Sequence, residues 1–205
     1  MSGTSVILAS ASPSRARMLA DAGVPVEILP SRVDEDEVKR SLLAERATAH
    51  QVAETLAELK AMRVSARVPG VLVIGADQVL ALGDATIGDA MLDKPASLDE
   101  ARSHLKRLHG GSHRLVSAVA VALDGRRIWG AMDEAELVMR RLSDAFIDDY
   151  LDRVGDQALQ SVGAYQLEGL GAQLFSRIRG DYFTILGLPL LPLLGFLRDR
   201  RVLLD

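Results

Sequence analysis

One carboxylate and one amide stand side by side in the middle of the chain, where an apolar run ends. Asp77 and Gln78 follow the small residues at 75–76 and precede a second apolar run, 79–82. An acid inside such a stretch is costly unless it is paired or works at a cleft, and the small residues let a ligand approach the backbone. Asp77 is therefore either an acid at the exposed end of a strand or a catalytic or metal-binding group, with Lys94 reaching it on a loop to hold phosphate.

Residues 10–15, Ser-Ala-Ser-Pro-Ser-Arg, form a second candidate site, which suits an anion. They follow a short apolar run and precede a helical pattern, so Ser12 suits the N-cap and Pro13 the first helical position. Such a turn offers backbone N–H groups and the positive end of a helix dipole to phosphate, and Arg15 can bind phosphate oxygens through two bonds. The alternative is an ordinary capped helix, because the glycine pattern of a P-loop or a dinucleotide turn is absent.

Three more charged residues have both an ordinary and a functional interpretation. Glu35 lies in the acidic cluster 34–37, which is either a solvated helix start or a source of a ligand for Mg²⁺, an ion that prefers oxygen ligands. Lys60 lies on an Ala-rich helical pattern and is expected to face solvent. Glu168 is a lone acid in the Gly-rich stretch 162–174, which is either a turn or a loop with one functional acid. The four histidines lack the spacing of metal ligands.

Strands and helices alternate along the chain and must position these side chains. Short apolar or alternating runs predict strands at residues 6–9, 24–29, 71–74, 113–123, 127–132, 134–139 and 173–178. Helical patterns occupy residues 13–22, 42–68 and 98–108, a stretch that starts at residue 143, and the apolar segment 185–197. This mixture predicts an α/β or mixed α+β fold.

Composition limits the possible classes of protein. A chain of 205 residues with 48% hydrophobic residues suits one domain, or two small lobes, with a sizeable core. A net charge of −4 argues against binding of nucleic acid polymers. The absence of cysteine excludes disulfides and thiolate sites, and fits a reducing cytoplasm. No apolar stretch reaches the ~20 residues of a membrane-spanning helix, and no basic region precedes an apolar one as in a secretory signal.

Taken together and in order, the motifs resemble the Maf family of nucleoside triphosphate pyrophosphatases, first described as septum-formation inhibitors. No single motif is specific, but the ordered set is, and it covers nearly the whole chain. The matching motifs lie at residues 10–15, 33–35, 56–61, 75–77, 94–95, 163–165, 168–169 and 187–190.

This resemblance implies a single domain over residues 1–205, with a mixed, elongated sheet flanked by helices, two lobes, a central cleft and often a homodimer. It implies hydrolysis between the α- and β-phosphates of a nucleotide with Mg²⁺ or Mn²⁺. By position, Asp77 would be the catalytic acid/base and Glu35 would help it to hold metal or water. The residues that would bind the triphosphate are Ser10, Arg15, Lys60 and Lys94.

Three positions bear on the choice of base. Where family members that act on dTTP and UTP have Arg, Thr and Gln, this chain has Ser14, Gln78 and Glu168. The last two resemble the subgroup that hydrolyses 7-methyl-GTP, whereas Ser14 fits neither subgroup. A carboxylate can accept from both N1–H and the 2-amino group of guanine, and N7-methylation adds a positive charge. We expect 7-methyl-GTP as substrate; the alternatives are a dTTP/UTP or broad-specificity pyrophosphatase, and a non-catalytic nucleotide-binding regulator of cell division.

Overall fold

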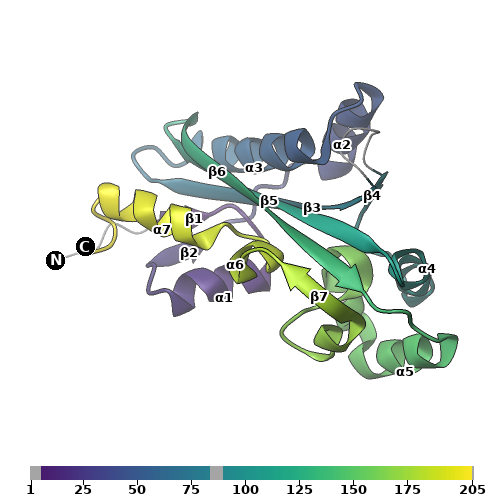
Figure 1. Ribbon diagram of the computed structural model, residues 1–205. Helices are drawn as coiled ribbons and strands as arrows, with labels where there is room; N and C mark the ends of the chain where they lie inside the picture. Colours follow the sequence, from purple (N-terminus) through teal and green to yellow (C-terminus); the bar gives the residue numbers. More distant parts are fainter. Residues whose placement is uncertain (1–5, 84–89, 205) are drawn as a thin grey trace.

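A computed structural model describes residues 6–83 and 90–204, and its strands there form one mixed sheet (Figure 1). The order is β2-β1-β3-β5-β6-β7, with β4 also paired to β3. β1 runs parallel to β2 and β3, and the other pairs are antiparallel. The strands are β1 (Val6–Leu8), β2 (Val26–Ile28), β3 (Val73–Leu82), β4 (Ala90–Leu92), β5 (Ser112–Leu123), β6 (Arg126–Met139) and β7 (Phe175–Arg179).

Helices cover both faces of this sheet (Figure 1). They are α1 (Pro13–Asp21), α2 (Glu35–Ala44), α3 (Ala49–Ser65), α4 (Leu98–Leu108), α5 (Asp144–Val154), α6 (Tyr182–Ile185) and α7 (Leu190–Asp199), with 3-10 turns η1 (Gly155–Gln160), η2 (Val162–Ala164) and η3 (Leu170–Leu174). α3 packs on one face of β3 and β5, while α1 and α7 pack on the other. The predicted mixed fold, with an elongated sheet flanked by helices, is confirmed. None of the described helices is both long enough and apolar enough to cross a membrane.

On the face of the sheet opposite α3, two hydrophobic cores share the long central strands. At one end, Ile74 of β3 and Val121 of β5 pack with α1 and α7. At the other end, Leu80 and Leu115 of the same strands pack with α4 and α5. Alternation along a strand places these side chains on one face, so the two cores lie side by side beneath one sheet and correspond to two lobes.

Local structure differs from the sequence-based expectation in several places. The apolar segment 185–197 is not one helix, because Gly187 with φ +100° and Pro189 separate the end of α6 from the start of α7. Asp77 is not at an exposed strand end, because β3 continues through it from residue 73 to 82 and leaves it 5% exposed. The segments 127–132 and 134–139 form the single strand β6. The expected helix 42–68 is interrupted, because Thr48 caps α3 in a capping box with Gln51 and so starts a new helix.

Candidate active site

The outer edge of β3 is open along residues 75–79. β1 pairs with β3 as far as Ile74, and β4 begins its pairing at Leu80. β5 follows the opposite edge throughout, so among the described residues no strand lies beside this interval. Because neighbouring side chains alternate between faces, Asp77 points toward α3 and Gln78 points away from it. Functional groups from both faces of the sheet can therefore meet at this edge.

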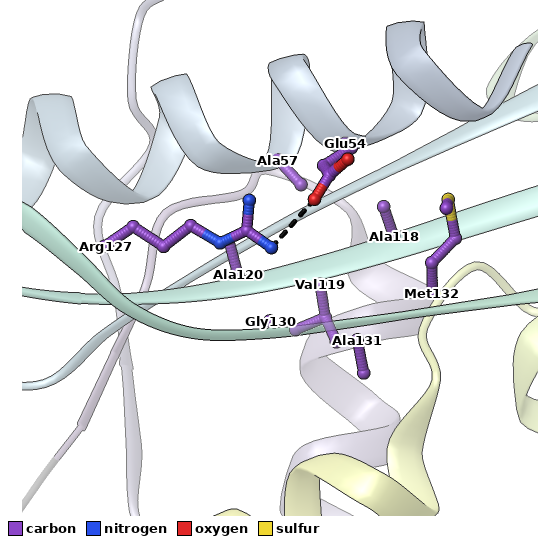
Figure 2. Close-up of a pocket in the computed structure, with 9 residues that line it drawn as sticks. All are labelled: Glu54, Ala57, Ala118, Val119, Ala120, Arg127, Gly130, Ala131 and Met132. Carbon is purple, nitrogen blue, oxygen red and sulfur yellow. Dashed lines mark ion pairs between the residues drawn. The ribbon is translucent and has the colours of Figure 1, made fainter. Parts of the chain in front are cut away.

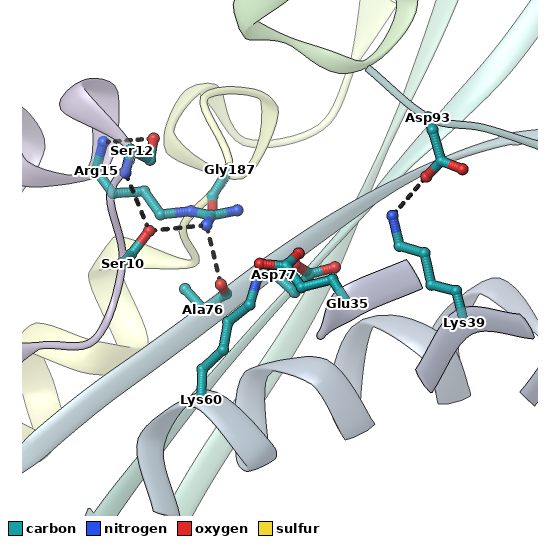
Figure 3. Close-up of polar contacts among 10 residues, drawn as sticks. All are labelled: Ser10, Ser12, Arg15, Glu35, Lys39, Lys60, Ala76, Asp77, Asp93 and Gly187. Carbon is teal, nitrogen blue, oxygen red and sulfur yellow. Dashed lines mark hydrogen bonds and ion pairs between the residues drawn. The ribbon is translucent and has the colours of Figure 1, made fainter. Parts of the chain in front are cut away.

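Asp77 forms a buried ion pair with Lys60 of α3. Lys60 Nζ lies 2.7 Å from Asp77 Oδ1 and 2.9 Å from Glu35 Oε2 (Figure 3). Lys60 is only 5% exposed, so the expectation that it faces solvent is wrong. The reason is close packing: a Cβ at Gly75 would lie 2.2 Å from the carbonyl oxygen of Ala57, so only glycine allows α3 to approach β3 this closely. A buried ammonium is then tolerated because carboxylates surround it.

The second oxygen of Asp77 is the candidate reactive atom. Oδ2 is buried and has no hydrogen-bond partner within the described parts of the chain. Glu35 lies in the first turn of α2, behind the N-cap Asp34, with 43% of its side chain exposed. Carboxylate oxygens are the ligands that Mg²⁺ prefers, and Mg²⁺ often takes one or two of them and leaves the rest to substrate phosphates and water. Asp77 and Glu35 supply two such carboxylates, and Asp77 Oδ2 is the buried oxygen that lacks a partner among the described residues. Residues 6–83 and 90–204 contain no cluster of three or more potential metal ligands.

The serine-rich turn lies against the same edge. Ser12 caps α1 by accepting from the Arg15 backbone N–H at 3.4 Å, as the sequence predicts. The Arg15 side chain donates to Ser10 Oγ at 3.3 Å, to the carbonyl oxygen of Ala76 at 2.9 Å and to that of Gly187 at 2.8 Å (Figure 3). Burial lowers the pKa of Arg15, and the negative charges of Asp77 and Glu35 oppose that shift. Arg15 thus fastens the turn to β3 and directs positive charge toward the two carboxylates.

Comparison with known proteins decides the family. The model of the family described as "Maf-like protein" matches residues 5–200. The chain belongs to the Maf family. A "Nucleoside triphosphate pyrophosphatase" of Paramagnetospirillum magneticum is 53% identical over 193 residues, which is 94% of this chain and 97% of that protein. A "7-methyl-GTP pyrophosphatase" of Rhizobium etli is 50% identical over 194 residues, 95% of each chain. The resemblance recognised in the sequence is confirmed.

Among solved structures, a HAM1 protein from Coxiella burnetii is 16% identical and has a TM-score of 0.43, covering 67% of this chain and 74% of that one.

Besides Lys60, two lysines of this Maf chain, Lys39 and Lys94, interact electrostatically with Asp77 and Glu35. Lys94 is exposed at the rim, and its pKa is lowered by desolvation and by the positive charges of Arg15 and Lys60. Lys39 was missed by sequence reasoning. It lies one turn after Glu35 on α2 and forms an ion pair with Asp93, the neighbour of Lys94 (Figure 3). Burial lowers the pKa of Lys39, but the hydrogen bond and charge of Asp93 outweigh this effect and raise it.

The residues expected to select the base lie on both sides of Arg15. Ser14 Oγ donates to Glu168 Oε1 at 3.5 Å, although 154 residues separate them. This contact joins the start of α1 to the loop between η2 and η3. Gln78 Nε2 lies 3.0 Å from Ser117 Oγ and from the carbonyl oxygens of Thr184 and Ile185. Gln78 is therefore tied to α6, on the sheet face opposite Asp77.

A separate pocket of about 140 Å³ lies between α3 and the strands β5 and β6 (Figure 2). Arg127 crosses it and pairs with Glu54 at 2.8 Å and Glu58 at 2.9 Å. Gly130 gives it room, since a Cβ there would lie 2.5 Å from Arg127 Nη2. None of the residues predicted for the site lines this pocket. Its arginine is already paired with these two carboxylates, so the open edge of β3 remains the candidate active site.

Proposed function

We propose that this chain is a nucleoside triphosphate pyrophosphatase that acts on 7-methyl-GTP and releases 7-methyl-GMP and pyrophosphate. The enzyme class, a hydrolase, follows from relatives about half identical over nearly the whole chain. The observation that carries the catalytic part is the buried Asp77 at the open edge of β3. Lys60 holds one of its oxygens, and the other has no partner among the residues that the structure describes.

In this proposal Asp77 is the general base. Its Oδ2 would take the proton of the water that attacks the α-phosphate, while Lys60 holds Oδ1 and so fixes the direction of the free oxygen. Hydrolysis of a triphosphate mainly requires an aligned water and compensation of negative charge. Positive charge near the edge would come from Arg15, Lys60 and Lys94. Ser10 and the N-terminal end of α1 would orient the phosphates, because the free N–H groups of a helix start bind anions.

A divalent cation fits this arrangement. Asp77 and Glu35 would hold Mg²⁺ or Mn²⁺, which when bound would polarise the phosphate oxygens and neutralise their charge. Without the cation, Lys60 pairs with both carboxylates and offsets one of their two negative charges. Glu35 is the more exposed of the two, so it has more freedom to turn from Lys60 toward a ligand.

The choice of 7-methyl-GTP rests on Glu168. Its carboxylate lies beside Ser14 at the start of α1, next to the expected phosphate site. A carboxylate accepts from the two adjacent donors of guanine and also favours the positive charge that N7-methylation adds. The name of the Rhizobium etli relative supports the same base.

We also propose that the protein is a cytoplasmic homodimer and that each chain forms a single domain over residues 1–205. The one sheet that holds all the described strands supports the single domain.

The test is a panel of substrates. Pyrophosphate release is measured with 7-methyl-GTP, GTP, dTTP and UTP, each with Mg²⁺, with Mn²⁺ and with a chelator. We expect the highest kcat/KM for 7-methyl-GTP and no release with the chelator. A preference for dTTP or UTP would overturn the base but leave the enzyme class intact. Tight binding of a nucleotide that is never hydrolysed, with either metal present, would favour the non-catalytic regulator.

A further inference from the structure

We propose that Ser117 and the carbonyl end of α6 are positioning elements that turn Gln78 so that it offers the nucleotide base only a hydrogen-bond acceptor, Oε1. The inference rests on the proposed function, since it assumes that a base is recognised at this site. It extends that function by assigning a role to two buried groups on the far side of β3 from Asp77.

The orientation of the amide follows from its neighbours. Gln78 Nε2 lies 3.0 Å from the carbonyl oxygens of Thr184 and Ile185. Carbonyl oxygens only accept, so the amide nitrogen must face them and Oε1 must point elsewhere. Ser117 closes the network: its hydroxyl donates to Thr184 O at 2.8 Å and accepts from Gln78 Nε2 at 3.0 Å. The amide hydrogens are therefore committed within the protein.

The fold holds these carbonyls in place. Thr184 and Ile185 end the one-turn helix α6, and the last C=O groups of a helix are open to side-chain donors. Thr184 O also accepts from the Gly187 N–H at 3.1 Å. Asp181 caps this helix by accepting from the Thr184 N–H at 3.0 Å. Thr184 Oγ1 donates to Asp133 Oδ2 of β6 at 2.7 Å. Ser117 and Thr184 are fully buried, so water does not compete for these bonds.

The free oxygen of Gln78 faces the side of Arg15. Among the described residues, no donor forms a hydrogen bond with Oε1. A Cβ built on Gly187 would lie 3.6 Å from Gln78 Oε1 and 3.4 Å from Arg15 Nη2. Gly187 therefore separates the two groups without filling the space between them. Arg15 is in turn the neighbour of Ser14, which contacts Glu168.

The orientation of the Gln78 amide limits which nucleotide bases the site can bind. In isolation, an amide can match uracil or thymine with its own donor and acceptor. Here the donor of Gln78 is already used, and Glu168 is a carboxylate that only accepts. A site lined by two acceptors suits a base with adjacent donors, such as the N1–H and 2-amino group of guanine. Uracil and thymine present two acceptors and one donor, and so match it poorly.

The experiment compares Ser117→Ala with a matched control, Ser65→Ala. Ser65 is equally buried, and its hydroxyl accepts a single hydrogen bond, from the Gly125 N–H at 3.1 Å, on the side of α3. The readout is the ratio of kcat/KM for 7-methyl-GTP to that for UTP. Loss of one orienting hydrogen bond should lower this ratio about 3- to 10-fold in Ser117→Ala. The Ser65→Ala variant should keep the wild-type ratio. A purely structural role for Ser117 would lower both kcat/KM values together and leave the ratio unchanged, which would overturn the proposal.

A double-mutant cycle separates positioning from any other effect. If Ser117 acts through Gln78, Ser117→Ala should not change the ratio further in a Gln78→Leu background. An equal effect in both backgrounds would refute the inference. Calorimetric binding of 7-methyl-GMP and UMP to the same variants gives a second ratio that does not require turnover. A protein that binds both nucleotides but hydrolyses neither triphosphate would therefore refute the proposed function and still test the role of Ser117.

Discussion

Lys60 holds one oxygen of Asp77 and leaves the other free. Its Nζ lies 2.7 Å from Oδ1, whereas Oδ2 is buried with no hydrogen-bond partner in residues 6–83 and 90–204. Glu35 shares the same ammonium at 2.9 Å, so the three side chains carry one net negative charge. A buried, unpaired carboxylate oxygen is costly. This site is therefore completed by a water, a metal or a substrate.

Replacing Asp77 by Asn tests the catalytic oxygen. The amide keeps an oxygen that can accept from Lys60 but cannot take a proton, so we expect pyrophosphate release to fall about 10²- to 10⁴-fold. The unfolding temperature should remain close to that of the wild type, because Glu35 still pairs with Lys60. Asp152→Asn, at an exposed position on α5, is the control and should keep full activity. Normal turnover of the Asp77 variant would rule out the general-base role.

Lys60→Met tests the ion pair. The change leaves Asp77 buried without its cation, and removal of one partner of a buried pair lowers the free energy of unfolding by about 3 kcal/mol or more. The double variant with Asp77→Asn should recover much of this loss, because no buried charge is left without a partner at position 77, and the Glu35 side chain, which is 43% exposed, can be solvated. Urea denaturation of both variants measures the difference. Equal stability of the single and double variants would show that the pair contributes little.

Glu168→Gln tests the choice of base. The amide replaces one acceptor by a donor, so kcat/KM for 7-methyl-GTP should fall while that for UTP is retained or rises. A loss of about 10-fold in the ratio corresponds to one charge-assisted hydrogen bond. Glu27→Gln, at an exposed position on β2, serves as the control. If the ratio is unchanged, Glu168 does not contact the base.

Gly187→Ala tests the backbone strain at Gly187, the residue that lies between Arg15 and Gln78. Gly187 has φ +100°, which L side chains rarely adopt, although a Cβ would meet only ordinary contacts of 3.4–3.6 Å. Backbone strain alone should therefore lower the free energy of unfolding by about 1–3 kcal/mol. The same change at Gly195, within α7 and with open space around it, should instead raise it by about 0.5–1 kcal/mol. Thermal unfolding of the two variants distinguishes these opposite signs.

His113 should make stability depend on pH. Its Nε2 lies 2.7 Å from the hydroxyl of Tyr165, Nδ1 is buried with no hydrogen-bond partner in the described chain, and burial lowers the His113 pKa to about 4. Between pH 6.5 and 4 the unfolded chain binds a proton that the folded chain does not. Stability therefore falls as pH falls through this window, by about 2 kcal/mol between pH 7.5 and 5.

The comparison is with His113→Gln, which can still bond to Tyr165 but does not titrate, and with His109→Gln at an exposed position. Urea denaturation from pH 7.5 to 5 should show a shallower loss for His113→Gln alone. Parallel curves for wild type and His113→Gln would show that other groups set the acid sensitivity.

Local hydrogen bonds made parts of the fold predictable. Ser12 with Pro13 sets the start of α1, and Ser97 sets that of α4, because each cap is decided within four residues. The start of α3 has the same kind of signal, the capping box of Thr48 and Gln51. The Ala-rich helical pattern on both sides of this signal concealed the break between the helices.

Burial and long-range contacts could not be predicted in this way. Lys60 is buried because α3 packs closely against Gly75. Gly75 lies outside the helical pattern, so that pattern alone could not predict the burial of Lys60. Gln78 meets Ser117, 39 residues away, only through the register of β3 with β5. The order of the family's motifs indicated which residues belong to one site. Their hydrogen-bond partners depend on the sheet.

The open edge of β3 has a consequence for solubility. An unpaired strand edge is a template on which another chain can add a strand and start aggregation. Here the interval 75–79 is short and bounded by β1 and β4, and Arg15 occupies the carbonyl oxygen of Ala76. Charged side chains at an edge oppose the approach of a second strand. The cations that we propose to bind a triphosphate would thus also protect the protein from intermolecular β-pairing when no nucleotide is bound.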